Sequence, residues 1–520
     1  MKIQSPESAA TSAIEALLQF AVRNSLIEDI DIPYYRNLLL DAVQMDAPAA
    51  IDGGMAFDPS APTATPILNV LCDVAAAKGI IEDLTYARDL FSARLMGLIT
   101  PSPRDIREDF TTVLSQDGAV DATDRFYQLC CACDYIKVDA IAQNIRYFAN
   151  TNAGELEITI NLSKPEKDPR EIAKPKNAPS AGYPKCMLCI ENPGYAGRSN
   201  FPARQNHRIL PLTLAGNPWY LQYSPYAYYH EHCIVFNREH IPMKIDRGTF
   251  ERLFSFVSQF PHYFLGSNAD LPIVGGSILN HDHFQGGRYT FPMDKADEEI
   301  VLAGDDPEIQ ASILDWPMST IQLASADSEA LINSAEQILN AWRNWTDESL
   351  CILSETEGVP HNTITPILRK DGDLWKLKLV LRNNLTSSEY PLGIYHPHDE
   401  LHHIKKENIG LIEVMGLFIL PGRLKTEIAD LVPFLTGERP LVRPDPSDPS
   451  EKHFDWIQKI IDRDGLSATV DQAMDRLRSE IAVVCAQVLA DAGVYKQNKE
   501  GREGFLRFLA SVGYTRKDNA

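Results

Sequence analysis

The feature that most constrains the fold is a change in the spacing of apolar residues along the chain. Apolar residues recur at helical intervals from residue 10 to about 150 and again from 451 to 511. The middle of the chain instead contains stretches with the alternation or composition of strands, at 155–163, 219–225, 232–236 and 375–381. We therefore expect an α+β fold with an all-α N-terminal region and a helical C-terminal segment.

The chain has 520 residues, which is too long for one ordinary hydrophobic core. We predict three parts: a helical domain at 1–150, a half with the chemistry-bearing motif at 151–330, and a second half at 331–520. The second half repeats features of the first, since His396 and His398 have the same spacing as His281 and His283.

Charge and composition exclude several partners. The formal net charge of -22 argues against non-specific binding to nucleic acid or to an anionic membrane surface. No apolar run approaches the ~20 residues that span a bilayer, and Glu7 precedes the first apolar stretch, unlike in a signal peptide. The 9 cysteines are irregularly spaced and do not suggest a disulfide framework. We expect a cytoplasmic protein.

The stretch most suggestive of chemistry runs from Gly275 to Gly287. It contains His281 and His283, which would point to the same side of an extended strand, together with Gln285. Glycines on both sides allow a ligand to approach the backbone closely. An imidazole beside a neutral amide suits attack on a phosphoryl group. The alternative is a half-buried strand whose histidines have only structural partners.

A neutral histidine can attack phosphorus if one ring nitrogen donates a hydrogen bond and leaves the other with a free lone pair. A backbone carbonyl near His283 could hold that tautomer, while Gln285 could donate to a phosphoryl oxygen. This arrangement would fit a covalent nucleotidyl-histidine and ping-pong turnover. Physics alone does not decide which of the two histidines attacks. The locally basic loop nearest to the Gly275–Gly287 stretch in the sequence contains Arg198, Arg204, Asn206 and Arg208.

A second constellation has the ligand types of a metal site. Cys186 and Cys189 have the spacing at which two thiolates share one tetrahedral zinc ion. His240, after one predicted strand, and His281, at the start of another, could complete a closed structural site that fixes the position of His283. The alternatives are a redox pair, or two buried thiols and two unrelated histidines.

These residues resemble a known family. The run from Asn280 to Gln285 resembles the H-x-H-x-Q motif of the histidine-triad superfamily, in its nucleotidyltransferase branch. Stretches 226–233, 360–366 and 402–413 resemble the second sequence type of galactose-1-phosphate uridylyltransferase. The match covers roughly residues 155–435. One departure stands inside the motif, where Asp282 and Phe284 occupy positions that are proline and glycine in the first type.

The resemblance implies a duplicated, histidine-triad-like antiparallel sheet and the reaction of UDP-glucose with galactose 1-phosphate to give glucose 1-phosphate and UDP-galactose. It implies that His283 carries the uridylyl group and that Gln285 contacts the transferred phosphoryl. It also implies a homodimer and a zinc site formed by Cys186, Cys189, His240 and His281. Residues expected to bind UDP-sugars and hexose 1-phosphates are Arg204, Asn206, Asn268, Gly275, Gly276, Ser277 and Asn280.

Two other functions stay open at this stage. One is a related adenylyltransferase or phosphorylase that acts on dinucleoside polyphosphates, which a comparison of nucleotide donors would separate. The other is a zinc-stabilised binding protein without enzymatic activity, in which the motif is structural. The glycines around the motif, and the presence of Arg204 and Asn206 in the basic loop, favour an enzyme.

Overall fold

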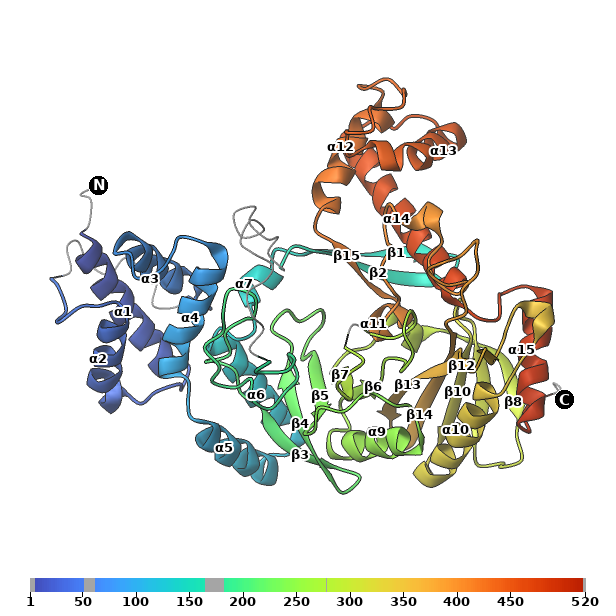
Figure 1. Cartoon of the computed structure of the whole chain (residues 1–520), viewed down its shortest axis with the longest axis horizontal. Helices are drawn as coiled ribbons and strands as arrows, with labels where there is room; N and C mark the ends of the chain where they lie inside the picture. Colours follow the sequence, from blue (N-terminus) through green and yellow to red (C-terminus); the bar gives the residue numbers. More distant parts are fainter. Residues whose placement is uncertain (1–4, 51–60, 164–181, 277, 518–520) are drawn as a thin grey trace. The chain divides into compact units, whose positions relative to one another are not determined.

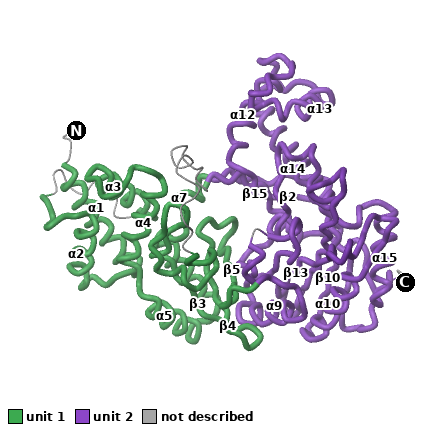
Figure 2. The backbone as a smooth tube through the Cα atoms, viewed as in Figure 1, with its two compact units in different colours: residues 1–143, 163–241 green, residues 144–162, 242–520 purple. Residues whose placement is uncertain are grey.

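The computed structural model describes residues 5–50, 61–163, 182–276 and 278–517. The chain forms two compact units (Figures 1 and 2). Unit 1 comprises residues 1–143 and 163–241, and unit 2 comprises residues 144–162 and 242–520. Each unit is described separately below. The three-part division at 150 and 330, and the duplication of the two halves, remain predictions.

Unit 1 begins with the predicted helical region. Its helices are α1 (Pro6–Arg23), η1 (Asp29–Asp31), α2 (Ile32–Ala42), α3 (Thr65–Ala77), α4 (Thr85–Ile99), α5 (Pro103–Gln116), α6 (Ala119–Ala132) and α7 (Val138–Ile141). Ser102 caps α5, since its hydroxyl accepts a hydrogen bond from the amide of Asp105. The helical pattern ends before residue 150, because residues from Ile145 onward alternate in burial and form a strand.

Unit 1 also contains three antiparallel strands. They are β3 (Leu210–Leu214), β4 (Asn217–Tyr223) and β5 (Cys233–Asn237). A tight turn at Ala215 and Gly216, both with positive φ, joins β3 to β4. Trp219 pairs with Asn237 in the ladder between β4 and β5 and is almost fully buried. The strands predicted at 219–225 and 232–236 are therefore confirmed.

Unit 2 is built on strands that are antiparallel neighbours in the order β16-β8-β9-β10-β14-β13-β6-β7. They are β6 (Phe264–Gly266), β7 (His283–Gly287), β8 (Glu298–Ala303), β9 (Gln310–Leu314), β10 (Thr320–Ser325), β13 (Asn362–Asp371), β14 (Leu374–Asn383) and β16 (Thr515–Arg516). The strand predicted at 375–381 lies within β14. A short pair, β11 (Glu355–Thr356) and β12 (Val359–Pro360), precedes β13.

A separate three-stranded sheet of unit 2 has the order β1-β2-β15. Its strands are β1 (Ile145–Thr151), β2 (Gly154–Asn161) and β15 (Leu417–Pro421). β1 and β2 form a hairpin, and β15 pairs parallel to β2 although it follows about 260 residues later. The strand predicted at 155–163 is thus confirmed. The passage at 165–185 is rich in Pro and Lys, a composition that predicts a surface linker, and it falls largely outside the described residues.

Helices cover both sheets of unit 2. α9 (Arg247–Gln259) and α10 (Ser328–Arg343) pack against β13, and α14 (Val470–Ala492) packs on β1 and β2 (Figure 1). The remaining helices are η2 (Pro292–Lys295), η3 (Glu348–Leu350), η4 (Asp399–Leu401), α11 (Leu411–Val414), α12 (Leu424–Thr436), η5 (Glu451–His453), α13 (Phe454–Asp464) and α15 (Lys499–Ser511). The structure confirms the α+β class and the helical C-terminal segment.

Among the residues that the structure describes, no helix combines the length and the apolar character needed to cross a membrane.

Candidate active site

The motif strand is shorter than the sequence suggests. β7 begins at His283, so His281 lies two residues before the strand rather than on it. The neighbouring β6 ends at Gly266, which pairs with Gln285, and its ladder therefore gives no support further upstream. The expectation that both histidines project from one extended strand is corrected: only His283 and Gln285 share it.

The geometry around His283 defines its tautomer. Its Nδ1 lies 2.8 Å from the carbonyl oxygen of His281. A carbonyl can only accept, so Nδ1 carries the proton and Nε2 keeps its lone pair. Burial lowers the pKa of His283 to about 4, while the bond to the His281 carbonyl opposes the change. The ring is 5% exposed and is neutral at neutral pH.

The two residues that depart from the family motif attach this strand to helix α9. Asp282 lies 3.9 Å from the guanidinium of Arg252, and both side chains are largely buried. The same guanidinium stands 6.0 Å from the ring centre of Phe284, within cation–π range. α9 begins where Asp246 accepts a hydrogen bond from the amide of Thr249. Sequence reasoning missed Arg252, because no local spacing indicates its contact with Asp282.

Asn268, which follows β6, has a defined amide orientation. Its Oδ1 accepts a hydrogen bond of 2.9 Å from the amide of Leu411, so the opposite end of the side-chain amide is the donor Nδ2. A side chain on Gly276 would place its Cβ 2.7 Å from that Nδ2. The predicted binding residues Asn268 and Gly276 are thus adjacent, and a larger residue at 276 would have to displace the Asn268 side-chain amide.

Gly275 is under the same constraint. A Cβ on it would lie 2.6 Å from the carbonyl oxygens of Ala269 and Leu271. Asn280 is exposed, and Ser277 lies outside the described residues. The structure therefore brings Asn268, Gly275 and Gly276 together in unit 2.

Arg204 and Asn206 lie in unit 1 against the end of helix α6. The Asn206 amide donates to the carbonyl of Cys133 over 2.9 Å. The Arg204 guanidinium stands 5.5 Å from the ring centre of Tyr135. Both contacts are structural, and contact of either residue with substrate stays a prediction.

Three predicted metal ligands come together in unit 1, and we call them the cysteine–histidine group: Cys186, Cys189 and His240. The two sulfurs are 3.6 Å apart, and the Cys189 sulfur is 3.2 Å from His240 Nδ1. The Asn192 amide donates to the carbonyls of both cysteines, at 2.9 Å and 2.8 Å, and shapes the turn between them. The ligand atoms lie within 4.8 Å of one another, so the group could hold a metal ion.

The protonation chemistry of this group fits a cation. Burial raises the pKa of the Cys186 thiol to about 11, so the thiolate needs a nearby positive charge. The Leu188 amide donates to the Cys186 sulfur over 3.4 Å, a contact that favours the thiolate. His281 is fully buried and belongs to unit 2. Its place as a fourth ligand stays a prediction.

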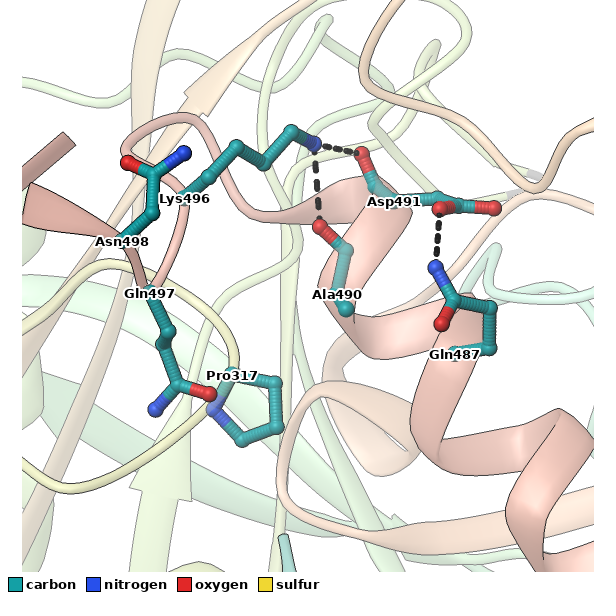
Figure 3. Close-up of a pocket in the computed structure, with 7 residues that line it drawn as sticks. All are labelled: Pro317, Gln487, Ala490, Asp491, Lys496, Gln497 and Asn498. Atoms are coloured by element: carbon teal, nitrogen blue, oxygen red, sulfur yellow. Dashed lines mark hydrogen bonds between the residues drawn. The ribbon is translucent and has the colours of Figure 1, made fainter. Parts of the chain in front are cut away.

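A pocket of about 290 Å³ lies elsewhere in unit 2, where α14 meets α15 (Figure 3). The Lys496 ammonium donates to the carbonyls of Ala490 and Asp491, each over 2.9 Å. The Asp491 carboxylate accepts from the amide of Gln487 over 2.8 Å. These contacts lie within α14 or join its C-terminal end to the loop that follows it, and none of the residues that line the pocket belongs to the predicted site.

Comparisons with known proteins bear on the function of this arrangement. Two family models match: galactose-1-phosphate uridyl transferase, N-terminal domain, over residues 45–242, and its C-terminal domain, over residues 256–434. A galactose-1-phosphate uridylyltransferase of Caldanaerobacter subterraneus is 51% identical, covering 96% of this chain and 98% of the relative. One of Bacillus subtilis is 44% identical, covering 96% and 97%. The structure of yeast Ap4A phosphorylase aligns with a TM-score of 0.30 and 13% identity, over 68% of this chain and 98% of that one.

Proposed function

Because the chain belongs to the galactose-1-phosphate uridylyltransferase family, we propose that its exchange of UMP between UDP-glucose and galactose 1-phosphate passes through a covalent uridylyl-histidine at His283. The protein is a transferase of this family. The observation that carries the proposal is the hydrogen bond from His283 Nδ1 to the His281 carbonyl, which leaves Nε2 with its lone pair.

In the first half-reaction, Nε2 of His283 attacks the α-phosphorus of UDP-glucose. A nitrogen–phosphorus bond forms, the bond from phosphorus to the bridging oxygen breaks, and glucose 1-phosphate leaves with that oxygen. The uridylylated ring carries a positive charge, and its Nδ1–H keeps donating to the His281 carbonyl. In the second half-reaction, a phosphate oxygen of galactose 1-phosphate attacks the same phosphorus, the nitrogen–phosphorus bond breaks, and UDP-galactose leaves while neutral His283 is regenerated.

The neutral donors around the motif would bind the non-bridging oxygens of the transferred group. Gln285 lies two residues along the same strand, and Asn268 presents Nδ2 beside Gly276. These amides neither protonate His283 nor repel the substrate. We assign the nucleotide phosphates to this part of unit 2, while Arg204, Asn206, Asn280 and Ser277 remain candidate contacts on the resemblance alone.

We also propose that the cysteine–histidine group holds zinc, with His281 as the fourth ligand predicted from the sequence. A closed site of two thiolates and two imidazoles would supply structural stability and no open position for water. The three ligands in unit 1 fit that ion through their donor set and mutual distances. Metal analysis of the purified protein tests this: about one zinc per chain is expected, and a Cys189→Ala variant should lose the zinc and melt at a lower temperature.

From the resemblance we further propose a cytoplasmic homodimer that acts on UDP-sugars and hexose 1-phosphates and binds neither nucleic acid nor membrane. Light scattering of the purified protein would report its mass in solution. A mass of one chain of 58.1 kDa, instead of two, would refute the dimer.

The covalent step is tested by incubating the protein with UDP-glucose alone. Mass spectrometry should then show one uridylyl group on the peptide that contains His283. The His283→Ala variant should carry none and should have no measurable turnover, whereas His230→Ala, which alters an exposed histidine of unit 1, should still be labelled. Turnover by the wild-type protein without any adduct would exclude this mechanism. Labelling by a dinucleoside polyphosphate but not by UDP-glucose would favour the alternative donor.

A further inference from the structure

The loop between β6 and the motif contains a backbone conformation that its residue type disfavours. Ile273 has a φ of +71°, in the left-handed region that β-branched residues rarely adopt. Such a conformation persists only when the surrounding structure enforces it. The loop Asn268–Gly276 also contains Gly275, whose bridge to Ala269 closes the loop on itself. The strain therefore lies two residues from the proposed phosphate donors.

Elements distant in sequence hold the first part of this loop. The amide of Ser267 donates to the carbonyl of Pro366 in β13 over 3.0 Å. The carboxylate of Asp270 accepts from the hydroxyl of Thr363 over 2.5 Å and from the guanidinium of Arg343 over 3.1 Å. The base of the loop is therefore fixed to the sheet and to α10.

A directed chain of hydrogen bonds reaches the strained turn itself. The Asn384 amide donates from Nδ2 to the carbonyl of Pro272 over 3.3 Å. Its Oδ1 accepts from Nδ1 of His361 over 2.8 Å, and Nε2 of His361 then accepts from the hydroxyl of Thr356 over 2.9 Å. Since amide oxygens only accept, the bond from His361 fixes which end of Asn384 faces Pro272. His361 and Asn384 are 8% and 7% exposed.

We propose that His361 and Asn384 are positioning residues for uridylyl transfer, which hold the loop Asn268–Gly276 in its strained conformation and so place its donors against the substrate phosphates. This inference rests on the proposed function, because that function assigns the phosphates to Asn268, Gly275 and Gly276. Neither His361 nor Asn384 needs to touch the substrate. Their effect is transmitted through the carbonyl of Pro272 and the backbone of Ile273.

The test uses Asn384→Asp, which keeps the acceptor for His361 but replaces the donor facing the Pro272 carbonyl with a second acceptor. We expect faster hydrogen exchange in the peptide covering 268–276 and an increase in KM for UDP-glucose on the order of tenfold, because small displacements at a reacting centre have large kinetic effects. The matched control is Gln337→Ala, since Gln337 on α10 also donates from a side-chain amide to a distant backbone carbonyl, that of Val512. It should change neither quantity.

A second variant separates positioning from simple stability. Ile273→Gly removes the strain, because glycine adopts positive φ freely, and it should fold at least as stably as the wild type. In the Ile273→Gly background the loop adopts its conformation without strain. Asn384→Asp should therefore change KM by no more than about twofold relative to Ile273→Gly alone. An equal effect of Asn384→Asp in both backgrounds would overturn the inference.

Failure of the positioning role can be distinguished from failure of the proposed function. If the wild-type protein does not exchange UMP, the proposed function fails, while hydrogen exchange still reports whether Asn384 holds the loop. If the wild-type protein turns over and Asn384→Asp matches Gln337→Ala in both KM and loop exchange, the positioning role fails and the proposed function stands.

Discussion

Acid should destabilise unit 2 through a buried histidine at the start of helix α13. His453 is fully buried, and its Nε2 donates to Glu427 over 3.2 Å. Its Nδ1 lies 2.8 Å from Nδ1 of His403, so one proton is shared between the two rings. Glu427 also accepts from Lys452 over 2.6 Å and from Arg423 over 2.5 Å. Protonation of His453 would place a third positive charge, beside those of Lys452 and Arg423, around the carboxylate of Glu427.

The magnitude follows from the pKa of His453. Burial lowers it from 6.5 to about 4, although Glu427 opposes the change, and the pKa of His403 is lowered in the same direction, chiefly by burial. The unfolded chain binds this proton near pH 6.5 and the folded chain only near pH 4. The stabilisation is therefore present above pH 6.5 and is lost as the pH falls toward 4, by about 3 kcal/mol. That is a large part of the ~5–15 kcal/mol of a typical domain.

The assay compares the urea-induced unfolding of wild type and His453→Gln at a series of pH values from 7 to 4. Titrations of groups that do not contact His453 occur in both proteins and cancel in the difference between their unfolding free energies, whereas His403 and Glu427 contact it and titrate as part of the same cluster. That difference should shrink by about 3 kcal/mol toward pH 4. Gln458→Ala, on the exposed part of α13, should give a difference that does not vary with pH. A pH-independent difference for His453→Gln as well would refute the reasoning.

Three further expectations follow from buried polar groups. Asp294→Asn should cost about 3–5 kcal/mol in urea unfolding, because Asp294 is the shared partner of Lys378 and Arg369; a loss below about 1 kcal/mol would contradict this. Tyr289→Phe removes the 2.6 Å hydrogen bond to the buried Glu157, which keeps its ion pair with Arg146, and should cost about 1–3 kcal/mol by the same measurement; no loss would contradict this. Removing metal with a chelator should lower the melting temperature and expose the thiols of the cysteine–histidine group to a thiol reagent; thiols equally reactive before and after would count against a bound ion.

Elements with a regular pattern were predictable from sequence, since their signal is local. The alternation at 155–163 correctly predicts strand β2 and the burial of Leu156, Ile158 and Ile160, but the intervening Glu157 and Thr159 are buried as well. The residues from Arg247 to Phe260 also have the character of a helix in the sequence, and the structure ends that helix one residue earlier, as α9. The grouping of Cys186 with Cys189 also follows from their spacing, because the ligands lie in one turn.

The remaining features of the site depend on contacts that no local pattern encodes. Asn268 is oriented by the amide of Leu411, 143 residues away, and the bond from Asn384 to Pro272 spans 112 residues. The positive φ of Ile273 contradicts the preference of its residue type, so sequence would predict the opposite. The motif strand starts only at His283, and its ladder with β6 covers Gln285–Gly287, a limit that no local pattern indicates.

The parallel pairing of β15 with β2 has a consequence for how the protein can be made. The hairpin β1–β2 leaves the ribosome early, but the third strand of this sheet ends at Pro421. The edge of β2 that pairs with β15 therefore stays unpaired while about 260 residues are synthesised. At typical rates of translation that is tens of seconds. Truncating the chain anywhere before Leu417 would leave this edge permanently bare, and such fragments should aggregate or recruit a chaperone rather than fold.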